Sequence, residues 1–192
     1  MSNLDIVIAG VGGQGTLLTS RVLGALALEL GLDVKVSEVH GMAQRGGSVI
    51  SFARLGENVA APLIDPGRAD YALAFEKLEA GRAAMFLKRG GTLIANTQQI
   101  PPMPVITGAA EYPVDIFEKL AGAYNLRVFD AEKLAREAGE PRAVNLTLLG
   151  ALAGLTGFDI DTWRSAIKAC IPRKLLDANI QAFNAGLAAS IG

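Results

Sequence analysis

The first thirty residues change from a continuous apolar run to a helical spacing of apolar positions. Residues 6–9 are Ile-Val-Ile-Ala, the pattern of a parallel strand that is covered on both faces. Leu18, Val22, Leu26 and Leu30 then recur every four residues, as they do along one side of a helix. The turn GVGGQG lies between them, so the sequence predicts a strand, a glycine turn and a helix.

The following segments continue this alternation, with one exception. Residues 33–39 follow a helix-ending glycine, Gly31, and read as a second strand. Residues 48–55 read as a strand that returns after the eight residues 40–47, and so short a return requires an antiparallel neighbour. Further strands are expected at 70–75, 92–95 and 126–129, and helices at 77–88 (ended by Gly90 and Gly91), 114–124, 144–155, 161–170 and 173–189.

This order predicts one α/β domain over residues 1–192. We expect a three-layer α/β/α sandwich with a mainly parallel sheet, one antiparallel element and a Rossmann-like glycine loop after the first strand. The prolines of PPMP at 101–104 predict an irregular crossing. The last helix carries an apolar stripe that either covers the sheet or meets another subunit, at Leu176, Ile180, Phe183 and Leu187.

Composition narrows the classes of partner. With 18 basic and 19 acidic residues the formal charge is −1, which gives no electrostatic reason to expect nucleic acid or an anionic membrane. An apolar fraction of 51% with 19% charged residues is high for a lone soluble monomer and indicates a protein partner. The chain starts with MSNLD and passes directly into a strand, without a signal-type or membrane-spanning segment, so we expect a cytoplasmic protein.

Cysteine usage limits the chemistry that this chain supports alone. Cys170 is the only cysteine, so the chain has no internal disulfide and too few thiolates for an iron–sulfur cluster or a cysteine-based zinc site. We expect no metal site in it. We interpret Cys170 as a small buried hydrophobic residue near a helix end.

The glycine turn predicts an anion site. Gly10, Gly12 and Gly15 fit the G-x-G-x-x-G spacing, in which glycine permits the tight turn and lets a ligand approach the main chain. The N-terminus of the following helix offers free N–H groups, and Thr16 adds a hydroxyl or caps the first turn. A purely structural turn remains an alternative. A P-loop is disfavoured because no lysine follows Gly15.

A second unusual cluster, SEVHGMAQRGGS at 37–48, follows the second strand at the edge where α/β sheets bind ligands. Glu38 lies 23 residues after Gly15, close to the spacing of the acidic residue that binds the ribose of NAD. The alternative is a polar loop in which Gly46 and Gly47 form a turn. His40, the only histidine, is then merely hydrogen-bonded at its edge.

Together, GVGGQG and SEVHGMAQRGGSV resemble the gamma domain of the 2-oxoacid:ferredoxin oxidoreductases. The resemblance continues through ADYALAFEKLEAGRA, TLIANT, NLTLLGALAGLTG and IPRKLLDANIQAFNAG, and so covers nearly the whole chain. A free-standing subunit of this length is most similar to the beta subunit of indolepyruvate:ferredoxin oxidoreductase.

The resemblance implies part of an enzyme that converts a 2-oxoacid and coenzyme A to an acyl-CoA and CO2, with electrons passing to ferredoxin. This chain lacks a GDG thiamine-diphosphate motif, so thiamine diphosphate and the iron–sulfur clusters are expected on a larger alpha-type subunit. Its own contribution would be to hold coenzyme A or the anionic end of the substrate. The residues expected to do so are Gly10, Gly12, Gly13, Gln14, Gly15, Thr16, His40, Gln44, Arg45, Gly46, Gly47 and Ser48.

Two other functions stay open at this point. One is an NAD(P)-dependent oxidoreductase that uses the same glycine loop together with Glu38. The other is a non-catalytic assembly module of the same complex, whose loops merely fit the surface of a partner.

Overall fold

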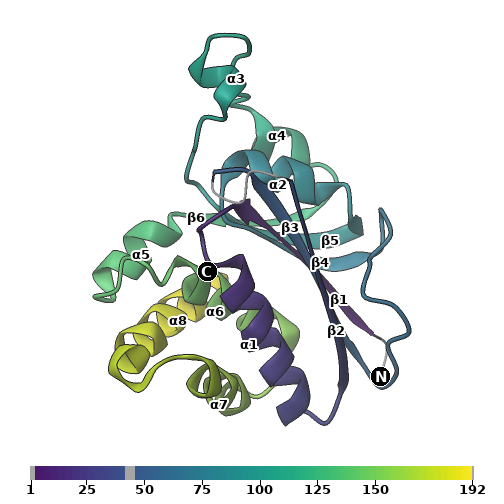
Figure 1. Ribbon diagram of the computed structural model, residues 1–192, viewed down its shortest axis with the longest axis vertical. Coiled ribbons are helices and arrows are strands. Elements are labelled where there is room, and N and C mark those ends of the chain that lie inside the picture. Colours follow the sequence, from purple (N-terminus) through teal and green to yellow (C-terminus); the bar gives the residue numbers. More distant parts are fainter. Residues whose placement is uncertain (1–2, 42–45, 192) are drawn as a thin grey trace.

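The computed structural model describes residues 3–41 and 46–191, which form one six-stranded sheet with helices on both faces (Figure 1). The strands lie in the order β2-β3-β1-β4-β5-β6. They are β1 (Leu4–Val11), β2 (Asp33–His40), β3 (Ser48–Gly56), β4 (Ala69–Ala74), β5 (Leu87–Asn96) and β6 (Asn125–Phe129). The helices are α1 (Thr16–Glu29), α2 (Lys77–Ala84), α3 (Met103–Ile106), α4 (Ile116–Leu120), α5 (Ala131–Glu137), α6 (Val144–Thr156), α7 (Ile160–Cys170), the short 3-10 helix η1 (Arg173–Leu175) and α8 (Leu176–Ile191).

The sheet is mainly parallel, and its antiparallel element is β3, as the sequence predicts. Strands β1, β4, β5 and β6 pair in parallel, whereas β3 pairs antiparallel with both β1 and β2. The physical reason is the short connection 41–47, which cannot hold the crossover that a parallel neighbour needs. As a result β3 separates β2 from β1.

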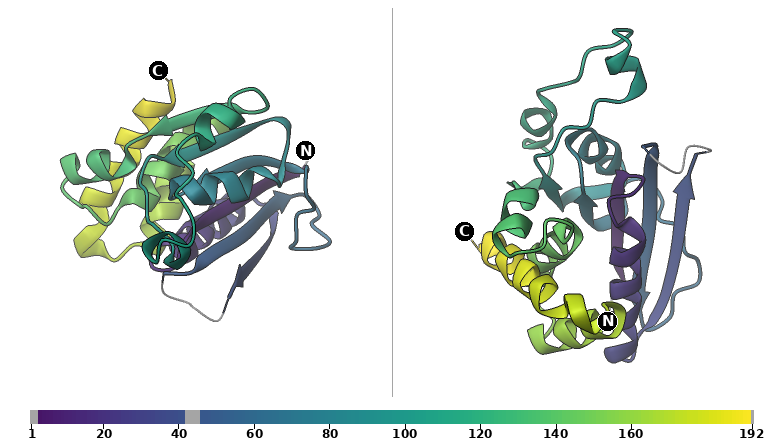
Figure 2. Two further views of the ribbon diagram at one scale, coloured as in Figure 1. Left: turned by 90° about the horizontal axis from the view of Figure 1, so that it is seen from above. Right: turned by 60° about the vertical axis from the view of Figure 1, so that its left-hand side comes forward.

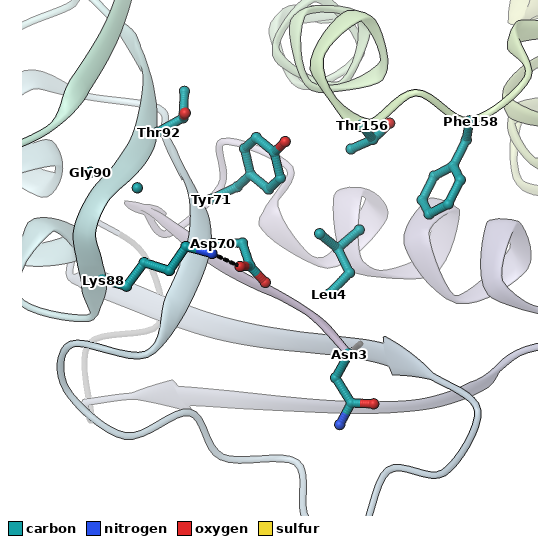
Figure 3. A pocket seen from close by; sticks show the side chains of 10 residues that line it. Asn3, Leu4, Asp70, Tyr71, Lys88, Gly90, Thr92, Thr156 and Phe158 are labelled. Atoms are coloured by element: carbon teal, nitrogen blue, oxygen red, sulfur yellow. Dashed lines mark hydrogen bonds and ion pairs between the residues drawn. The ribbon is translucent and has the colours of Figure 1, made fainter. Parts of the chain in front are cut away.

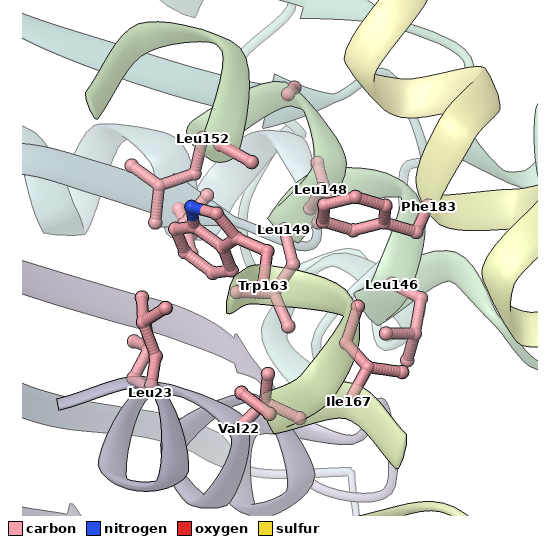
Figure 4. Packing of buried hydrophobic residues seen from close by; sticks show 14 of the residues in the cluster. Val22, Leu23, Leu146, Leu148, Leu149, Leu152, Trp163, Ile167 and Phe183 are labelled. Carbon is pink, nitrogen blue, oxygen red and sulfur yellow. The ribbon is translucent and has the colours of Figure 1, made fainter. Parts of the chain in front are cut away.

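Alternate residues of β1 enter two different cores. Ile6 and Ile8 pack with α1, α6 and α7, in a cluster that contains the fully buried Trp163 (Figure 4). Val7 and Ala9 pack on the other face, where α2 covers the sheet. Figure 2 shows the helices α6, α7 and α8 on the same side of the sheet as α1. The three-layer α/β/α arrangement is therefore confirmed.

Several predicted boundaries are wrong. Helix α2 ends at Ala84, and the strand β5 already begins at Leu87, so Gly90 and Gly91 lie within a strand and do not end the helix. The pairing of β4 with β5 shifts at this point, and the positive φ of 72° at Gly90 belongs to the resulting bulge. Apolar residues continue from the end of α2 into the start of β5. The periodicity alone therefore does not show where the helix ends and the strand begins.

The connection between β5 and β6 also differs from the prediction. The PPMP segment contains a short helix, α3, which projects away from the sheet (Figure 1). The helix expected at 114–124 is shorter, because α4 spans only Ile116–Leu120. Helix α5 was not predicted, although Asp130 caps it by accepting a hydrogen bond from the N–H of Lys133.

The C-terminal apolar stripe packs within the chain, against α6. Phe183 is completely buried there, and two glycines bring the backbones of α6 and α8 into contact. A Cβ atom at Gly150 would lie 1.9 Å from the carbonyl oxygen of Phe183, and one at Gly186 would lie 1.8 Å from the carbonyl oxygen of Thr147. The close crossing of these helices therefore requires glycine at both positions.

We expect the Gly186→Ala variant to lose about 3 kcal/mol or more of unfolding free energy, because its methyl group would overlap backbone atoms that cannot rotate away. Gly24→Ala is the matched control. It lies inside α1 with no atom within 4 Å of the added methyl group, so it should stabilise the chain by about 0.5–1 kcal/mol. Urea unfolding of both variants measures the difference, and equal stabilities would contradict the close α6–α8 contact.

Candidate functional site

The two glycine segments that the sequence singles out lie side by side at the carboxyl end of β1. The N–H of Gly12 donates to the carbonyl oxygen of Gly47 at 2.8 Å. The N–H of Gly46 donates to the carbonyl oxygen of Gly12 at 3.3 Å. These bonds extend the β1–β3 pairing beyond the pair formed by Val11 and Ser48. The antiparallel β3 thus brings both loops to one edge of the sheet.

The first loop needs glycine for two separate reasons. Gly13 and Gly15 have φ angles of 107° and 94°, in the left-handed region that other residues rarely adopt. At Gly10 the reason is space, because a Cβ atom would lie 3.0 Å from Cγ2 of Thr16 and 3.3 Å from Cβ of Phe75. The loop is held in one shape by these constraints.

Helix α1 begins without a side-chain cap. Gly15 occupies the N-cap position, no acidic residue lies in the first turn, and Thr16 is the first helical residue. The capping role expected for Thr16 is therefore wrong, since a side chain inside the helix cannot act as its N-cap. The N–H groups of the first turn have no partner within the helix and are available to an anion.

Gln14 turns its side chain into the protein. Its Oε1 accepts the N–H of Val11 at 2.7 Å, and its Nε2 donates to Oε1 of Gln98 at 2.7 Å and to the carbonyl oxygen of Phe75 at 3.3 Å. The side chain thus joins the ends of β1 and β4 to the segment after β5. It fixes the loop while still bordering the cavities described below.

Ser48 lies on the α2 face of the sheet. Its Oγ donates to Oε2 of Glu79 at 2.6 Å, and the Glu79 side chain is almost fully buried. Burial raises the pKa of Glu79 above its usual range, while the hydrogen bond from Ser48 and the charge of Arg82 act in the opposite direction. Ser48 therefore stabilises the charged form of a buried carboxylate.

His40 lies two strands away from the glycine loop. It is exposed at the end of β2, opposite Val49, which itself pairs with Gly10. Its Nδ1 lies 3.0 Å from the carbonyl oxygen of Gly41. Gln44 and Arg45, the other side chains expected in this cluster, lie outside the described residues.

Glu38 is poorly placed to bind the ribose of NAD. It pairs with Ser51, which pairs with Ile8, so Glu38 lies two strand spacings from β1, about 10 Å, and level with a residue before the loop. Its Oε2 accepts the hydroxyl of Ser51 at 3.3 Å. A dinucleotide-binding βαβ unit has its second strand beside the first, and here β3 occupies that place.

Glu76 is a buried carboxylate that sequence reasoning missed. Its Oε2 accepts the N–H groups of Leu78 at 2.6 Å and Glu79 at 3.1 Å, and so caps α2. Its Oε1 accepts the N–H of Ile100 at 2.9 Å and the hydroxyl of Tyr112, whose pKa is raised by burial and by this carboxylate. Glu76 thereby fixes both ends of the projecting segment that contains α3.

Two cavities border the glycine loop, and both are lined by Gly13, Gln14 and Arg142. One has a volume of about 270 Å³ and is also lined by Gly15, Leu18, Glu140, Asn145, Cys170, Ile171, Pro172, Leu175 and Asn179. The other, of about 260 Å³, is also lined by Gln98, Ile100, Glu132 and Val144. Only the tertiary structure reveals Arg142 and Asn145, because both lie far from the loop in sequence.

Cys170 is half-buried at the wall of the larger of these cavities. Burial raises the pKa of its thiol, so the neutral form predominates at neutral pH. The neutral state agrees with the interpretation from the sequence, but the residue is half-buried rather than buried.

A different cavity, of about 360 Å³, lies at the opposite ends of the strands, where β1 and β4 begin (Figure 3). Its charged groups are already paired, because Lys88 forms an ion pair with Asp70. The hydroxyl of Tyr71 donates to the carbonyl oxygen of Leu155 at 2.9 Å. In α/β sheets ligands bind at the carboxyl ends of strands, so the glycine-loop edge is the better candidate.

The described residues contain no cluster of histidine, cysteine or acidic side chains placed to hold a metal ion. Over the same residues, no helix has the length and apolar character needed to cross a membrane.

The comparisons with known proteins agree on one family. The family model described as pyruvate ferredoxin/flavodoxin oxidoreductase matches residues 5–189. Indolepyruvate oxidoreductase subunit IorB of Thermococcus kodakarensis is 42% identical over 196 residues, covering 99% of this chain and 97% of the relative.

Solved structures share the fold. The gamma subunit of a keto/oxoacid ferredoxin oxidoreductase from Geobacter sulfurreducens matches with a TM-score of 0.72 at 23% identity, over 98% of each chain. The 2-oxoglutarate:ferredoxin oxidoreductase of Magnetococcus marinus, solved with 2-oxoglutarate, coenzyme A and succinyl-CoA bound, matches with a TM-score of 0.75 at 20% identity. That match covers 100% of this chain and 31% of the longer one. By its sequence, this chain belongs to the pyruvate ferredoxin/flavodoxin oxidoreductase family.

Proposed function

We propose that this chain is the small subunit of an indolepyruvate-type 2-oxoacid:ferredoxin oxidoreductase. Its relative at 42% identity is an indolepyruvate oxidoreductase subunit of nearly the same length. The reaction is the coenzyme A-dependent oxidative decarboxylation of an aryl 2-oxoacid to an acyl-CoA, with electrons passing to ferredoxin.

The chain acts with a larger subunit that carries thiamine diphosphate and the iron–sulfur clusters. A cluster needs several thiolates, and the chain has one cysteine. In the Magnetococcus marinus enzyme the match covers 31% of a longer chain, which supports the proposal that other parts of the complex lie outside a chain of this length. Thiamine diphosphate supplies the carbanion chemistry when it is bound on that partner.

The contribution of this chain is an anion site at the glycine-loop edge. The observation that carries this proposal is the pairing of Gly12 with Gly46 and Gly47, which places two glycine segments and the N-terminus of α1 together. Backbone N–H groups and the helix dipole favour a phosphate or carboxylate there. Arg45 directly precedes Gly46 in sequence, and we propose that its guanidinium completes the site.

An assembly role accompanies this function. An apolar cavity of about 560 Å³ lies on the α2 side of β2 and β3, lined by Val39, Ile50, Phe52 and Phe86 together with residues at the strand ends. An uncovered apolar area on a subunit of a larger complex is a contact surface for another chain.

In the complex with its larger subunit, the Arg45→Ala variant should raise the KM for coenzyme A or the 2-oxoacid about tenfold or more, since a charge-assisted bidentate contact is lost. The measurement is oxoacid- and coenzyme A-dependent reduction of ferredoxin. Arg89→Ala, an exposed arginine at the other edge of the sheet, is the control and should leave both KM values unchanged. Unaltered kinetics in the Arg45 variant would remove this residue from the site.

The chain alone should show no tight binding of NAD(H) or NADP(H), because β3 displaces Glu38 from the ribose position. Calorimetric titration of the purified chain measures this. Micromolar nicotinamide binding accompanied by hydride transfer would favour the dehydrogenase alternative.

The Ser48→Ala variant tests whether Ser48 acts on the fold or on a ligand. The pKa of Glu79 is higher in the folded chain than the ordinary glutamate value of 4.5, so the buried carboxyl favours its neutral form. The stability that Glu79 contributes therefore falls as the pH rises above 4.5 and the group ionises. Removing the Ser48 hydroxyl raises that pKa further. The variant should therefore match the wild type near pH 4 and be about 1 kcal/mol less stable at pH 8.

Ser165→Ala is the matched control, because Ser165 donates to Glu29 in an exposed pair. It should change stability by less than about 0.5 kcal/mol at either pH. A Ser48 variant with wild-type stability at pH 8 but a raised KM would assign Ser48 to ligand binding alone.

A further inference from the structure

The larger cavity beside the glycine loop is lined by a side-chain amide that has no hydrogen-bond partner among the described residues. The side chain of Asn145, in the first turn of α6, is nearly enclosed, and the residue is only 3% exposed. Its Nδ2 lies 3.1 Å from the position of a Cβ atom on Gly15. Across residues 3–41 and 46–191, no residue forms a hydrogen bond with this side chain.

The amide of Asn145 is not sealed from solvent, so its unpaired donor and acceptor can be reached through the cavity. The indole N–H of Trp163 differs from the Asn145 amide, because it lies in the core and not at a cavity wall. Its indole N–H also has no partner, but it is enclosed by side chains such as Leu152 and cannot meet a ligand (Figure 4). Asn145 instead lines a cavity of about 270 Å³.

A positively charged side chain, Arg142, lines both of the cavities beside the glycine loop. Arg142 is exposed, lines both cavities, and lies three residues before Asn145. Within the described part of the chain its guanidinium forms no ion pair, although Glu140 lines the same cavity. The N-terminus of α1 adds its N–H groups at Gly15, which lies beside Asn145.

Apolar side chains form much of the remaining wall, beside the polar Glu140 and Asn179. Leu18 comes from α1, while Ile171, Pro172 and Leu175 come from the connection between α7 and α8. The volume of about 270 Å³ is slightly below the usual range of ligand-binding cavities, which suits a ring or short chain that forms part of a ligand.

We infer that this cavity binds the apolar body of an organic anion, with the anionic group at Arg142 and the glycine loop, and with a polar group of the body on the Asn145 amide. The inference rests on the proposed function, because it extends the anion site at Gly13 and Gly15 inward. Two molecules share this chemistry: an aryl 2-oxoacid, through its carboxylate, and coenzyme A, through a phosphate and its amide-bearing arm.

The Asn145→Leu variant tests the inference. Leucine has nearly the shape of asparagine but cannot hydrogen-bond, so the variant should be as stable as the wild type or more so in thermal unfolding. Its affinity for the ligand should nevertheless fall about tenfold. A structural amide would give the opposite pattern, in which stability falls and binding is retained.

The binding experiment uses the purified full chain and isothermal titration with indole-3-pyruvate, coenzyme A and inorganic phosphate separately. Binding of one of the two organic anions, weakened about tenfold by Asn145→Leu and by Arg142→Ala but not by Arg89→Ala, supports the inference and identifies the ligand. Binding of inorganic phosphate alone, binding that both cavity variants leave unchanged, or no binding of either organic anion would overturn it.

The same variants in the complex separate this inference from the proposed function. If the wild-type complex reduces ferredoxin with a 2-oxoacid while Asn145→Leu has unchanged KM values, the proposed function stands and the cavity site fails. If the wild-type complex has no such activity, the proposed function itself fails.

Discussion

The site depends on the antiparallel position of β3 between β2 and β1. Because the connection 41–47 is too short for a crossover, the chain returns beside β1 and its first residues pair with the glycine loop. That pairing brings together two turns that are more than thirty residues apart in sequence. Their backbone N–H groups then lie at the same end of the sheet. The pairing also removes β2 from the place where a dinucleotide-binding fold needs it. One topological constraint therefore both assembles the loops of the proposed anion site and disfavours the dehydrogenase.

Hydrogen bonds of the half-buried Gln14 and Gln98 and of the buried Glu76 hold the glycine-loop end of the sheet in shape. Gln14 joins the loop to Gln98, and the carbonyl oxygen of Gln98 accepts the N–H of Lys77, so the loop, the start of α2 and the segment after β5 form one connected unit. Glu76 continues this unit to both ends of the projecting segment around α3. A partner that contacted the projecting segment would therefore touch a structure that is continuous with the glycine loop.

The two faces of the sheet are covered to different extents. The α1 face is closed tightly by α6, α7 and α8, where glycines let helix backbones touch. The opposite face is closed by α2 over β1, β4 and β5, and beside α2 an apolar cavity is lined by Val39, Ile50, Phe52 and Phe86. The high apolar fraction of the sequence agrees with a dense core on one side and with the contact surface that we propose on the other.

The sequence by itself determined the layered α/β fold, the antiparallel strand and the glycine positions, because periodicity, loop length and turn chemistry are local properties. It failed at the junction of α2 with β5, where helical and strand spacings overlap, and at Thr16, whose place in the helix depends on the φ angle of Gly15. Only the tertiary structure decided that Ser48 serves Glu79, that the C-terminal stripe covers α6, and that Asn145 and Arg142 adjoin the loop. These contacts join residues far apart in the chain, and no local pattern records which distant side chains folding will place within hydrogen-bond distance.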